Sequence, residues 1–332
     1  GGTVDIDAGT IHVTGNETVT GGSTVTKKAK GDITVGGDQT VTGSTLTESS
    51  SEGAITVTGS ETVTDSTVTK TAKNDITVGG DQTVTGSTLA ETSRDGGIAV
   101  TGSEPVTDST VTKKAEGDIT VDGNREVTKS TLAETSSDGG IAVGGSETIT
   151  SGSTVTKTAK RNITVGGNRE VTGSTLTETS SDGGIAVGGS ETVTDSQVTK
   201  TAEGNITVDG NREVTGSTLA ETSRDGGIAV TGNETISGSE VTKTAKGHIT
   251  VGGNQTVTGS TLTETSSNGS IETKGSLTLA DTTAQLTAQK DLTVGGNMTV
   301  TGGTLKAQAE TGSVTLTKLR TWKTTTDFQA GA

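Results

Sequence analysis

Short runs of alternating hydrophobic and polar residues recur along the chain from Ile11 to the segment that begins at Val314. The triplet Ile33-Thr34-Val35 shows the pattern, because in an extended backbone its two apolar side chains fall on one side and the threonine on the other. A period this short, with many β-branched residues and few helix formers, predicts stacked coils of β-strands and argues against helical repeats. Further copies, 21 or 22 residues apart, begin at Ile55, Ile76, Ile98, Ile119, Ile141, Ile163, Ile185, Ile206, Ile228 and Ile249, and weaker copies at Ile11, Ile271, Leu292 and Val314.

Each repeat contains three alternating segments, which read ITV, TVT and STVT or STLT. In the repeat that begins at Ile33, alternation places Ile33, Val35, Val41 and Leu46 on one side and the threonines on the other. Glycine-containing pairs separate the segments and supply corners that can reach positive φ. Three strands and three corners make one coil of a parallel β-helix, in which each strand pairs with its copy about 4.8 Å away in the next coil.

The sequence therefore predicts an all-β fold, a right-handed parallel β-helix (solenoid) of about 15 coils of 21–22 residues with three short strands in each. We expect a single repeat domain over residues 1–317, with regular two-coil super-repeats over 11–270 and degenerate coils over 271–317. Residues 318–332 leave the repeat and contain the only Trp and Phe. Because the last coil exposes unpaired strand edges, we expect this segment to be a C-terminal tail or a cap.

Charge alternates strictly at one position of the coil, two residues after the core residue of the third strand. Opposite charges stacked about 4.8 Å apart attract, and each such exposed contact contributes about 0.2–1 kcal/mol. A slip of one coil would place lysine against lysine, so the alternation also favours the correct register. Inheritance from a duplicated two-coil unit is the alternative explanation. We expect an exposed charge ladder of Lys27, Glu48, Lys70, Glu91, Lys113, Glu134, Lys157, Glu178, Lys200, Glu221, Lys243 and Glu264.

Two other positions of the coil carry related columns. In the column at the start of the second strand, Glu alternates with Gln or Arg: Glu17, Gln39, Glu61, Gln82, Glu104, Arg125, Glu147, Arg169, Glu191, Arg212, Glu234 and Gln255. The column three residues before each triplet alternates less regularly: Lys30, Glu52, Lys73, Asp95, Glu116, Asp138, Lys160, Asp182, Glu203, Asp225, Lys246 and Asn268.

The composition of the 332 residues is unusual for a folded protein, with 51 Gly, no Cys, almost no aromatic residues and a net charge of −15. Such a chain would normally be read as disordered, but its strict periodicity predicts a narrow core of stacked Ile, Val and Leu. The acidic balance argues against a nucleic-acid partner. No apolar run approaches the roughly 20 residues of a membrane-spanning helix, so we expect no membrane span. We expect a monomer without cofactors or bound metal.

Candidate chemistry in the sequence is sparse, and we expect no enzyme. His248 occupies a corner position where other coils have Asp or Asn, which favours a structural role, and no Ser-His-Asp set can be assembled. Aspartates beside corner glycines are interpreted as turn residues rather than calcium ligands. Outward Thr-x-Thr pairs, such as Thr40 and Thr42, leave an ice-binding solenoid as a less favoured alternative.

The run NDITVGGDQTVTGSTL, from Asn74 to Leu89, resembles the haemagglutinin repeats of filamentous-haemagglutinin-like exoproteins, and so does KDLTVGGNMTVTGGTL, from Lys290 to Leu305. The shared pattern covers nearly the whole chain up to about Thr317. This resemblance implies a large bacterial adhesin or toxin-delivery filament that is secreted by a two-partner system and folds outside the cell as a right-handed β-helix. It also implies an outer-membrane transporter as a partner, reached through regions outside this segment.

We therefore expect a structural shaft of a secreted adhesin or toxin-delivery filament at the bacterial cell surface, which projects a tip domain for cell adhesion or biofilm formation. The alternative is that the repeats themselves bind host or matrix polysaccharide weakly and multivalently. The scarcity of aromatic residues counts against tight sugar stacking but leaves weak contacts open.

Overall fold

The computed structural model describes residues 1–331, and in that part of the chain every regular element is a β-strand. The chain forms two compact units, Gly1–Gly166 and Gly167–Ala332. Both units are stacks of the same coil, an all-β parallel β-solenoid with three strands per coil, as the sequence predicts. The handedness of the coil stays a prediction.

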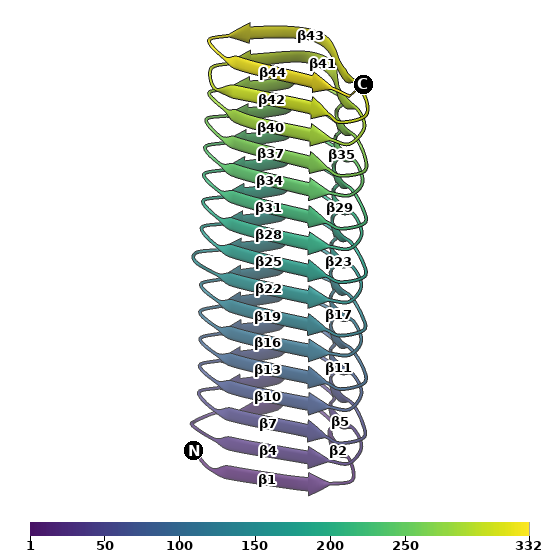
Figure 1. The fold of residues 1–332 in the computed structure, drawn as a ribbon. Helices are drawn as coiled ribbons and strands as arrows, with labels where there is room; N and C mark the ends of the chain where they lie inside the picture. Colours follow the sequence, from purple (N-terminus) through teal and green to yellow (C-terminus); the bar gives the residue numbers. More distant parts are fainter. Residues whose placement is uncertain (332) are drawn as a thin grey trace. The chain divides into compact units, whose positions relative to one another are not determined.

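Each coil of unit 1 has a three-residue strand, a four-residue strand (three residues in β3) and a six-residue strand (Figure 1). The three-residue strands are β2 (Ile11–Val13), β5 (Ile33–Val35), β8 (Ile55–Val57), β11 (Ile76–Val78), β14 (Ile98–Val100), β17 (Ile119–Val121), β20 (Ile141–Val143) and β23 (Ile163–Val165). The four-residue class comprises β3 (Glu17–Val19), β6 (Gln39–Thr42), β9 (Glu61–Thr64), β12 (Gln82–Thr85), β15 (Glu104–Thr107), β18 (Arg125–Thr128) and β21 (Glu147–Thr150). The six-residue strands are β1 (Thr3–Ala8), β4 (Thr24–Ala29), β7 (Thr45–Ser50), β10 (Thr67–Ala72), β13 (Thr88–Ser93), β16 (Thr110–Ala115), β19 (Thr131–Ser136) and β22 (Thr154–Ala159).

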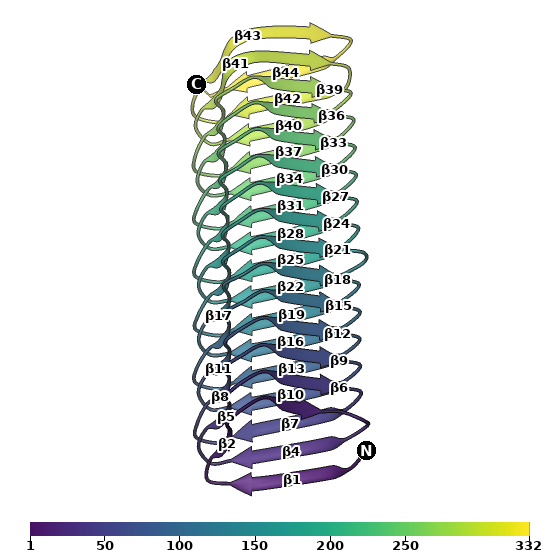
Figure 2. The ribbon, with the colours of Figure 1, turned by 180° about the vertical axis from the view of Figure 1, so that it is seen from behind.

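Unit 2 repeats this order, and the view from behind shows its shorter strands (Figure 2). The three-residue strands are β26 (Ile185–Val187), β29 (Ile206–Val208), β32 (Ile228–Val230), β35 (Ile249–Val251) and β38 (Ile271–Thr273). The four-residue strands are β24 (Arg169–Thr172), β27 (Glu191–Thr194), β30 (Arg212–Thr215), β33 (Glu234–Ser237), β36 (Gln255–Thr258) and β39 (Leu277–Ala280). The six-residue strands are β25 (Thr175–Ser180), β28 (Gln197–Ala202), β31 (Thr218–Ser223), β34 (Glu240–Ala245), β37 (Thr261–Ser266), β40 (Thr283–Ala288), β42 (Thr304–Ala309) and β44 (Thr325–Ala330), and two strands span a corner, β41 (Leu292–Thr301) and β43 (Val314–Trp322).

Neighbouring coils within a unit pair in parallel and residue for residue. Ile33 lies opposite Ile55, Val41 opposite Val63 and Leu46 opposite Val68. The predicted core residues Ile33, Val35, Val41 and Leu46 are at most 1% exposed. Stacked columns of Ile, Val and Leu therefore form the apolar part of the interior, as predicted, and each coil buries its apolar side against the coils above and below it.

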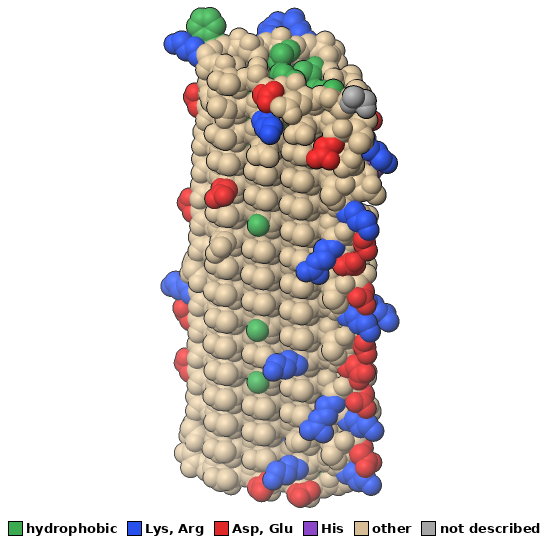
Figure 3. Space-filling model, in the orientation of Figure 1, with side chains coloured by type: hydrophobic (Ala, Val, Ile, Leu, Met, Phe, Trp, Pro, Cys, Tyr) green, Lys and Arg blue, Asp and Glu red, His purple; other side chains and the backbone are tan. Residues whose placement is uncertain are grey.

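The third strand is longer than the sequence reading assumed, and this lengthening changes which residues lie inside. In β7, Leu46, Glu48 and Ser50 are buried, whereas Thr45, Thr47 and Ser49 are half-buried and point outward. The outward positions of these strands are mostly threonine, so the face that they form in each unit carries few charges (Figure 3). Charged side chains gather along its edges, where the corners lie.

Glycines serve two different purposes at the corners. At the corner before the six-residue strand, Gly43 and Gly86 have φ of 56° and 59°, and Asp65, in the coil between them, adopts 50° despite its side chain. At the corner after the three-residue strand, glycine is needed because the backbones of neighbouring coils approach too closely to leave room for a side chain. A Cβ on Gly36 would lie 2.7 Å from the carbonyl oxygen of Thr14 in the preceding coil. Positive φ, expected at all corners, is thus concentrated at one of them.

The C-terminal segment continues the coil. Strand β43 pairs with β41, and β44 pairs with β42 from Thr325 to Ala330. The expected boundary at residue 317 therefore lies inside a strand, and the segment covers the preceding coil by adding another one. Its interior row is open to solvent, since Leu319, which lies opposite the buried Met298, is 42% exposed. Trp322 lies opposite the outward Thr301 and is 65% exposed. Ala332, the last residue of the predicted tail, lies outside the described residues.

Candidate functional site

The predicted charge ladder lies inside the solenoid, which corrects the expectation that it is exposed. All twelve of its residues, from Lys27 to Glu264, are at most 1% exposed. The physical reason is the strict alternation of the six-residue strand, because a residue two positions after a core leucine or valine points to the same side. The stacking itself occurs as predicted: Lys70 lies between Glu48 and Glu91, and Lys113 lies opposite Glu91 and Glu134.

The second column, on the four-residue strands, faces the ladder across the interior. Lys70 Nζ lies 2.5 Å from Glu61 in its own coil and 4.0 Å from Glu91 in the next coil. Lys243 Nζ lies 2.5 Å from Glu234 and 3.0 Å from Glu264. Charge therefore alternates along the ladder, and where the facing residue of the second column is charged, its sign is opposite. Sequence reasoning found both columns but not that they contact each other, since nine residues and a corner separate the partners in the chain.

Arginines in the second column make the most complete contacts. Arg212 donates from both terminal nitrogens to Glu221 at 2.8 and 2.7 Å, from Nε to Glu191 at 3.1 Å, and from Nη1 to Glu234 at 3.4 Å. Arg125 makes the same two-nitrogen contact with Glu134 at 2.7 Å and donates from Nε to Glu104 at 2.8 Å. This paired geometry fits the planar guanidinium and supplies donors to three carboxylates at once.

Three buried cations surround the carboxylate of Glu191. Burial alone would raise the pKa of Glu191, but Lys200, Arg212 and Arg169 outweigh burial and lower it to about 2. Lys200 Nζ lies 2.5 Å from this carboxylate. The pKa of Lys70 is raised in the corresponding way, since Glu61, Glu91 and Glu48 outweigh the burial that would lower it. The paired groups are therefore held in their charged forms.

The charge columns end in apolar residues within the C-terminal coils. Leu277 lies opposite Gln255, and Leu286 lies opposite Glu264. The next coils continue the two columns as Met298 and Leu319, and as Ala307 and Phe328. The same fold thus accepts apolar residues at these positions. Charge is consequently not needed to fill the interior, and its alternation is what distinguishes the ladder coils.

The third column, at the corner after the six-residue strand, is exposed. Lys160 lies 2.5 Å from Asp138, Lys246 lies 2.5 Å from Asp225, and Lys30 lies 3.7 Å from Glu52. Exposed pairs of this kind contribute little to stability because water and salt screen them. The exposed ion pairs that were expected for the ladder from Lys27 to Glu264 are thus found in this third column instead.

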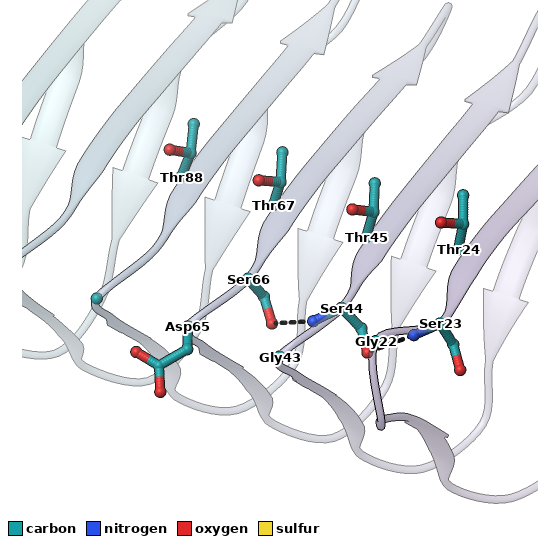
Figure 4. Close-up of a pocket in the computed structure, with 11 residues that line it drawn as sticks. Gly22, Ser23, Thr24, Gly43, Ser44, Thr45, Asp65, Ser66, Thr67 and Thr88 are labelled. Carbon is teal, nitrogen blue, oxygen red and sulfur yellow. Dashed lines mark hydrogen bonds between the residues drawn. The ribbon is translucent and has the colours of Figure 1, made fainter. Parts of the chain in front are cut away.

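Serines form a further buried column that the sequence reading missed. At the corner shown in Figure 4, Ser66 Oγ accepts the backbone N–H of Ser44 at 3.2 Å and donates to the carbonyl of Thr64 at 2.6 Å. Ser44 Oγ does the same for the N–H of Ser23, at 3.2 Å, and the carbonyl of Thr42. The serine that directly precedes the third strand in most coils, usually followed by threonine, was the available signal. These hydroxyls line a shallow hollow, but each is already committed to the backbone of its own and a neighbouring coil.

Replacing Ser66 by alanine should destabilise unit 1 by about 1–3 kcal/mol, because the N–H of Ser44 would stay buried without an acceptor. Ser49→Ala on the outward side of β7 is the matched control, and we expect little change for it. Denaturant unfolding followed by circular dichroism measures both variants. Equal unfolding midpoints for the two would contradict a structural role of the serine column.

Corner side chains also bond from coil to coil. Asp38 Oδ1 accepts the N–H of Ser60 at 2.9 Å, and Asp81 Oδ1 accepts that of Ser103 at 2.7 Å. His248 takes the expected corner role, since its Nδ1 accepts the N–H of Ser270 at 3.1 Å. The aspartates are thus occupied as turn acceptors. Among residues 1–331, no three acidic or histidine side chains converge as metal ligands.

Comparison of the chain with protein-family models, with curated protein sequences and with solved structures gave no match. Across the described residues, no helix is long and apolar enough to span a membrane. The candidate functional feature is therefore defined by geometry alone. In each unit it is a largely buried two-column array of charged and glutamine side chains, the interior ladder, formed by that unit's share of the twelve predicted residues and of the twelve that face them, from Glu17 to Gln255.

Proposed function

We propose that this segment is the structural shaft of a large secreted bacterial adhesin or toxin-delivery filament of the filamentous-haemagglutinin-like kind. The observation that carries the proposal is the uniformity of the coils, which pair residue for residue within each unit and vary in length by one or two residues. Such a protein supplies length and stiffness, while recognition or toxicity lies in other regions. Secretion through an outer-membrane transporter to the cell surface belongs to the same proposal and rests on the repeat resemblance.

The surface supports a passive role. Throughout residues 1–331 the corners are short, so no long loop walls a cleft there, and the outward positions of the six-residue strands carry mainly threonine hydroxyls. Trp322 and Phe328, the two aromatic residues of the chain, lie in the C-terminal coil rather than along the faces. Tight sugar binding usually combines a concave site with aromatic side chains.

A shaft should tolerate a change of length by whole super-repeats. Deletion of residues 98–140 removes two coils and brings Ile141 to the place of Ile98, so that Glu91 is followed by Lys157 and the charge alternation is kept. We expect this variant to fold with an unfolding midpoint close to that of the full segment. Deletion of residues 119–140 removes one coil and stacks Lys113 next to Lys157, so we expect a clearly lower midpoint.

Binding measurements test the passive role directly. We expect the isolated segment to bind no glycan on an array of host and matrix polysaccharides, both before and after the two-coil deletion. Clear, saturable binding would overturn the passive-shaft proposal and favour the multivalent polysaccharide alternative.

A further inference from the structure

Interior coils with glutamine in the second column lack a positive charge that their arginine counterparts have. Three stacked coils carry, in order, the pairs Glu61 and Lys70, Gln82 and Glu91, and Glu104 and Lys113. Together these coils bury three carboxylates but only two ammonium groups. The set of three coils centred on an arginine coil carries the pairs Glu104 and Lys113, Arg125 and Glu134, and Glu147 and Lys157. In this set three buried carboxylates are balanced by three cations. The glutamine coil therefore holds one surplus carboxyl group, and an unpaired buried carboxylate is costly.

Contact geometry identifies Glu91 as the surplus group. Its two neighbouring lysines make their short contacts elsewhere, Lys70 with Glu61 at 2.5 Å and Lys113 with Glu104. They approach Glu91 only to 4.0 and 3.7 Å. Its Oε1 accepts from Gln82 Nε2 at 2.9 Å, and its buried Oε2 lacks a hydrogen-bond partner. Glu134, the equivalent residue of an arginine coil, instead accepts two hydrogen bonds of 2.7 Å from Arg125.

We propose that Glu91 is a buried proton-binding site, which carries its proton at neutral pH in the folded protein and so removes the surplus charge of the glutamine coil. The groups packed around β13 leave this carboxyl without a short ionic contact. Strands β10 and β16 contribute Lys70 and Lys113, both engaged by other glutamates, and β12 contributes the neutral Gln82. Strands β9 and β15 add the carboxylates Glu61 and Glu104, and β11 and β14 add only Ile and Val to the interior.

Electrostatics also favours the protonated form of Glu91. Burial raises the pKa of Glu91 above its ordinary value and outweighs the opposing influence of Lys113, Lys70 and the Gln82 hydrogen bond. The folded state then holds a proton that the unfolded chain releases above its pKa of about 4.3. The contribution of Glu91 to folding stability consequently falls as pH rises from about 4.3 through its higher folded pKa. This is the reverse of the contribution of a glutamate whose folded pKa is lowered.

Infrared spectroscopy of two glutamine variants tests the proposal. Glutamine is isosteric with a protonated glutamate but takes up no proton on folding, so Glu91→Gln should raise the unfolding midpoint at neutral pH, whereas Glu134→Gln should lower it. The difference spectrum between the natural sequence and Glu91→Gln at neutral pH should contain the carbonyl band of a protonated carboxyl. The corresponding spectrum for Glu134→Gln should contain carboxylate bands. Carboxylate bands for Glu91, or a larger loss of stability for Glu91→Gln than for Glu134→Gln, would overturn it.

A Gln82→Arg variant provides the converse test, because Arg125 already occupies the equivalent place with the same kinds of neighbour. The added guanidinium should ionise Glu91, abolish the protonated-carboxyl band and remove the decline of stability with rising pH. Retention of the band in a folded Gln82→Arg protein would contradict the assignment. If this variant fails to fold, the comparison of Glu91→Gln with Glu134→Gln still decides the question.

Discussion

Substitution of Lys113 by glutamate is expected to unfold the coils around it. Lys113 Nζ contacts Glu104, lies 3.7 Å from Glu91 and donates to Gln82 Oε1 at 2.8 Å, with a side chain that is 0% exposed. Removing one partner of a buried ion pair costs about 3–5 kcal/mol. A carboxylate at this position would also face Glu91, Glu104 and Glu134 in the buried interior, so the total loss should exceed that range.

Two variants separate charge from shape in this experiment. Lys113→Gln removes the cation without adding an anion and should be less destabilising than Lys113→Glu. Lys114→Glu makes the same substitution at the next residue of β16, which points outward and is exposed, and should change the unfolding midpoint little. Because Lys113 is buried, its effect should persist at high salt, which would screen an exposed ladder. Equal midpoints for Lys113→Glu and Lys113→Gln would refute the stabilising role of charge alternation.

Glu191→Gln is expected to cause the second large loss, about 3–5 kcal/mol in unit 2. The substitution withdraws a carboxylate from Lys200 at 2.5 Å, Arg212 at 3.1 Å and Arg169 at 3.6 Å, and it leaves these cations buried with fewer partners. The lowered pKa of Glu191, about 2, implies a stabilising contribution on the order of 3 kcal/mol at neutral pH.

The pH dependence of this loss has a definite sign. A glutamate with a depressed folded pKa stabilises fully above its unfolded pKa of about 4.3, and the contribution disappears as pH falls toward the folded value of about 2. The difference between the natural protein and Glu191→Gln should therefore shrink across this window. Asp225→Asn, which breaks the exposed pair with Lys246, is the control and should shift the midpoint little. A Glu191→Gln protein as stable as Asp225→Asn would show that the interior pairs contribute nothing net.

An ionic interior needs an explanation other than stability alone, since buried ion pairs are often no more stabilising than apolar residues of similar volume. The C-terminal coils, with Leu277 and Leu286 in the same columns, show that this fold accepts the apolar version. Apolar columns would be equally satisfied after a slip of one coil. Alternating charges would not, because a slip places Lys on Lys and Glu on Glu in a medium that screens them weakly. We infer that the interior ladder selects register among nearly identical coils.

Periodicity alone was enough to predict the coil, its three strands and the core residues Ile33, Val35, Val41 and Leu46. The reason is that a two-residue alternation, repeated every 21 or 22 residues between glycine corners, is compatible with few other folds. The strict alternation of charge from Lys27 to Glu264 was equally visible in the sequence, as was its consequence for stacking.

What only the tertiary structure decided is where those charges lie. Lysine and glutamate are usually exposed, which is why the sequence suggested an exposed ladder. In the folded protein, strand alternation instead places Glu48 on the buried side of β7, together with Leu46 and Ser50. Burial of Glu48 is tolerable because Gln39 and Lys27, distant in the chain, meet it in the folded interior. Such partnership across the coil depends on corner geometry and on the neighbouring coils, neither of which a single repeat encodes. The same holds for Glu91. That its carboxyl group has no matching cation becomes apparent only when the buried charges of three stacked coils are counted together.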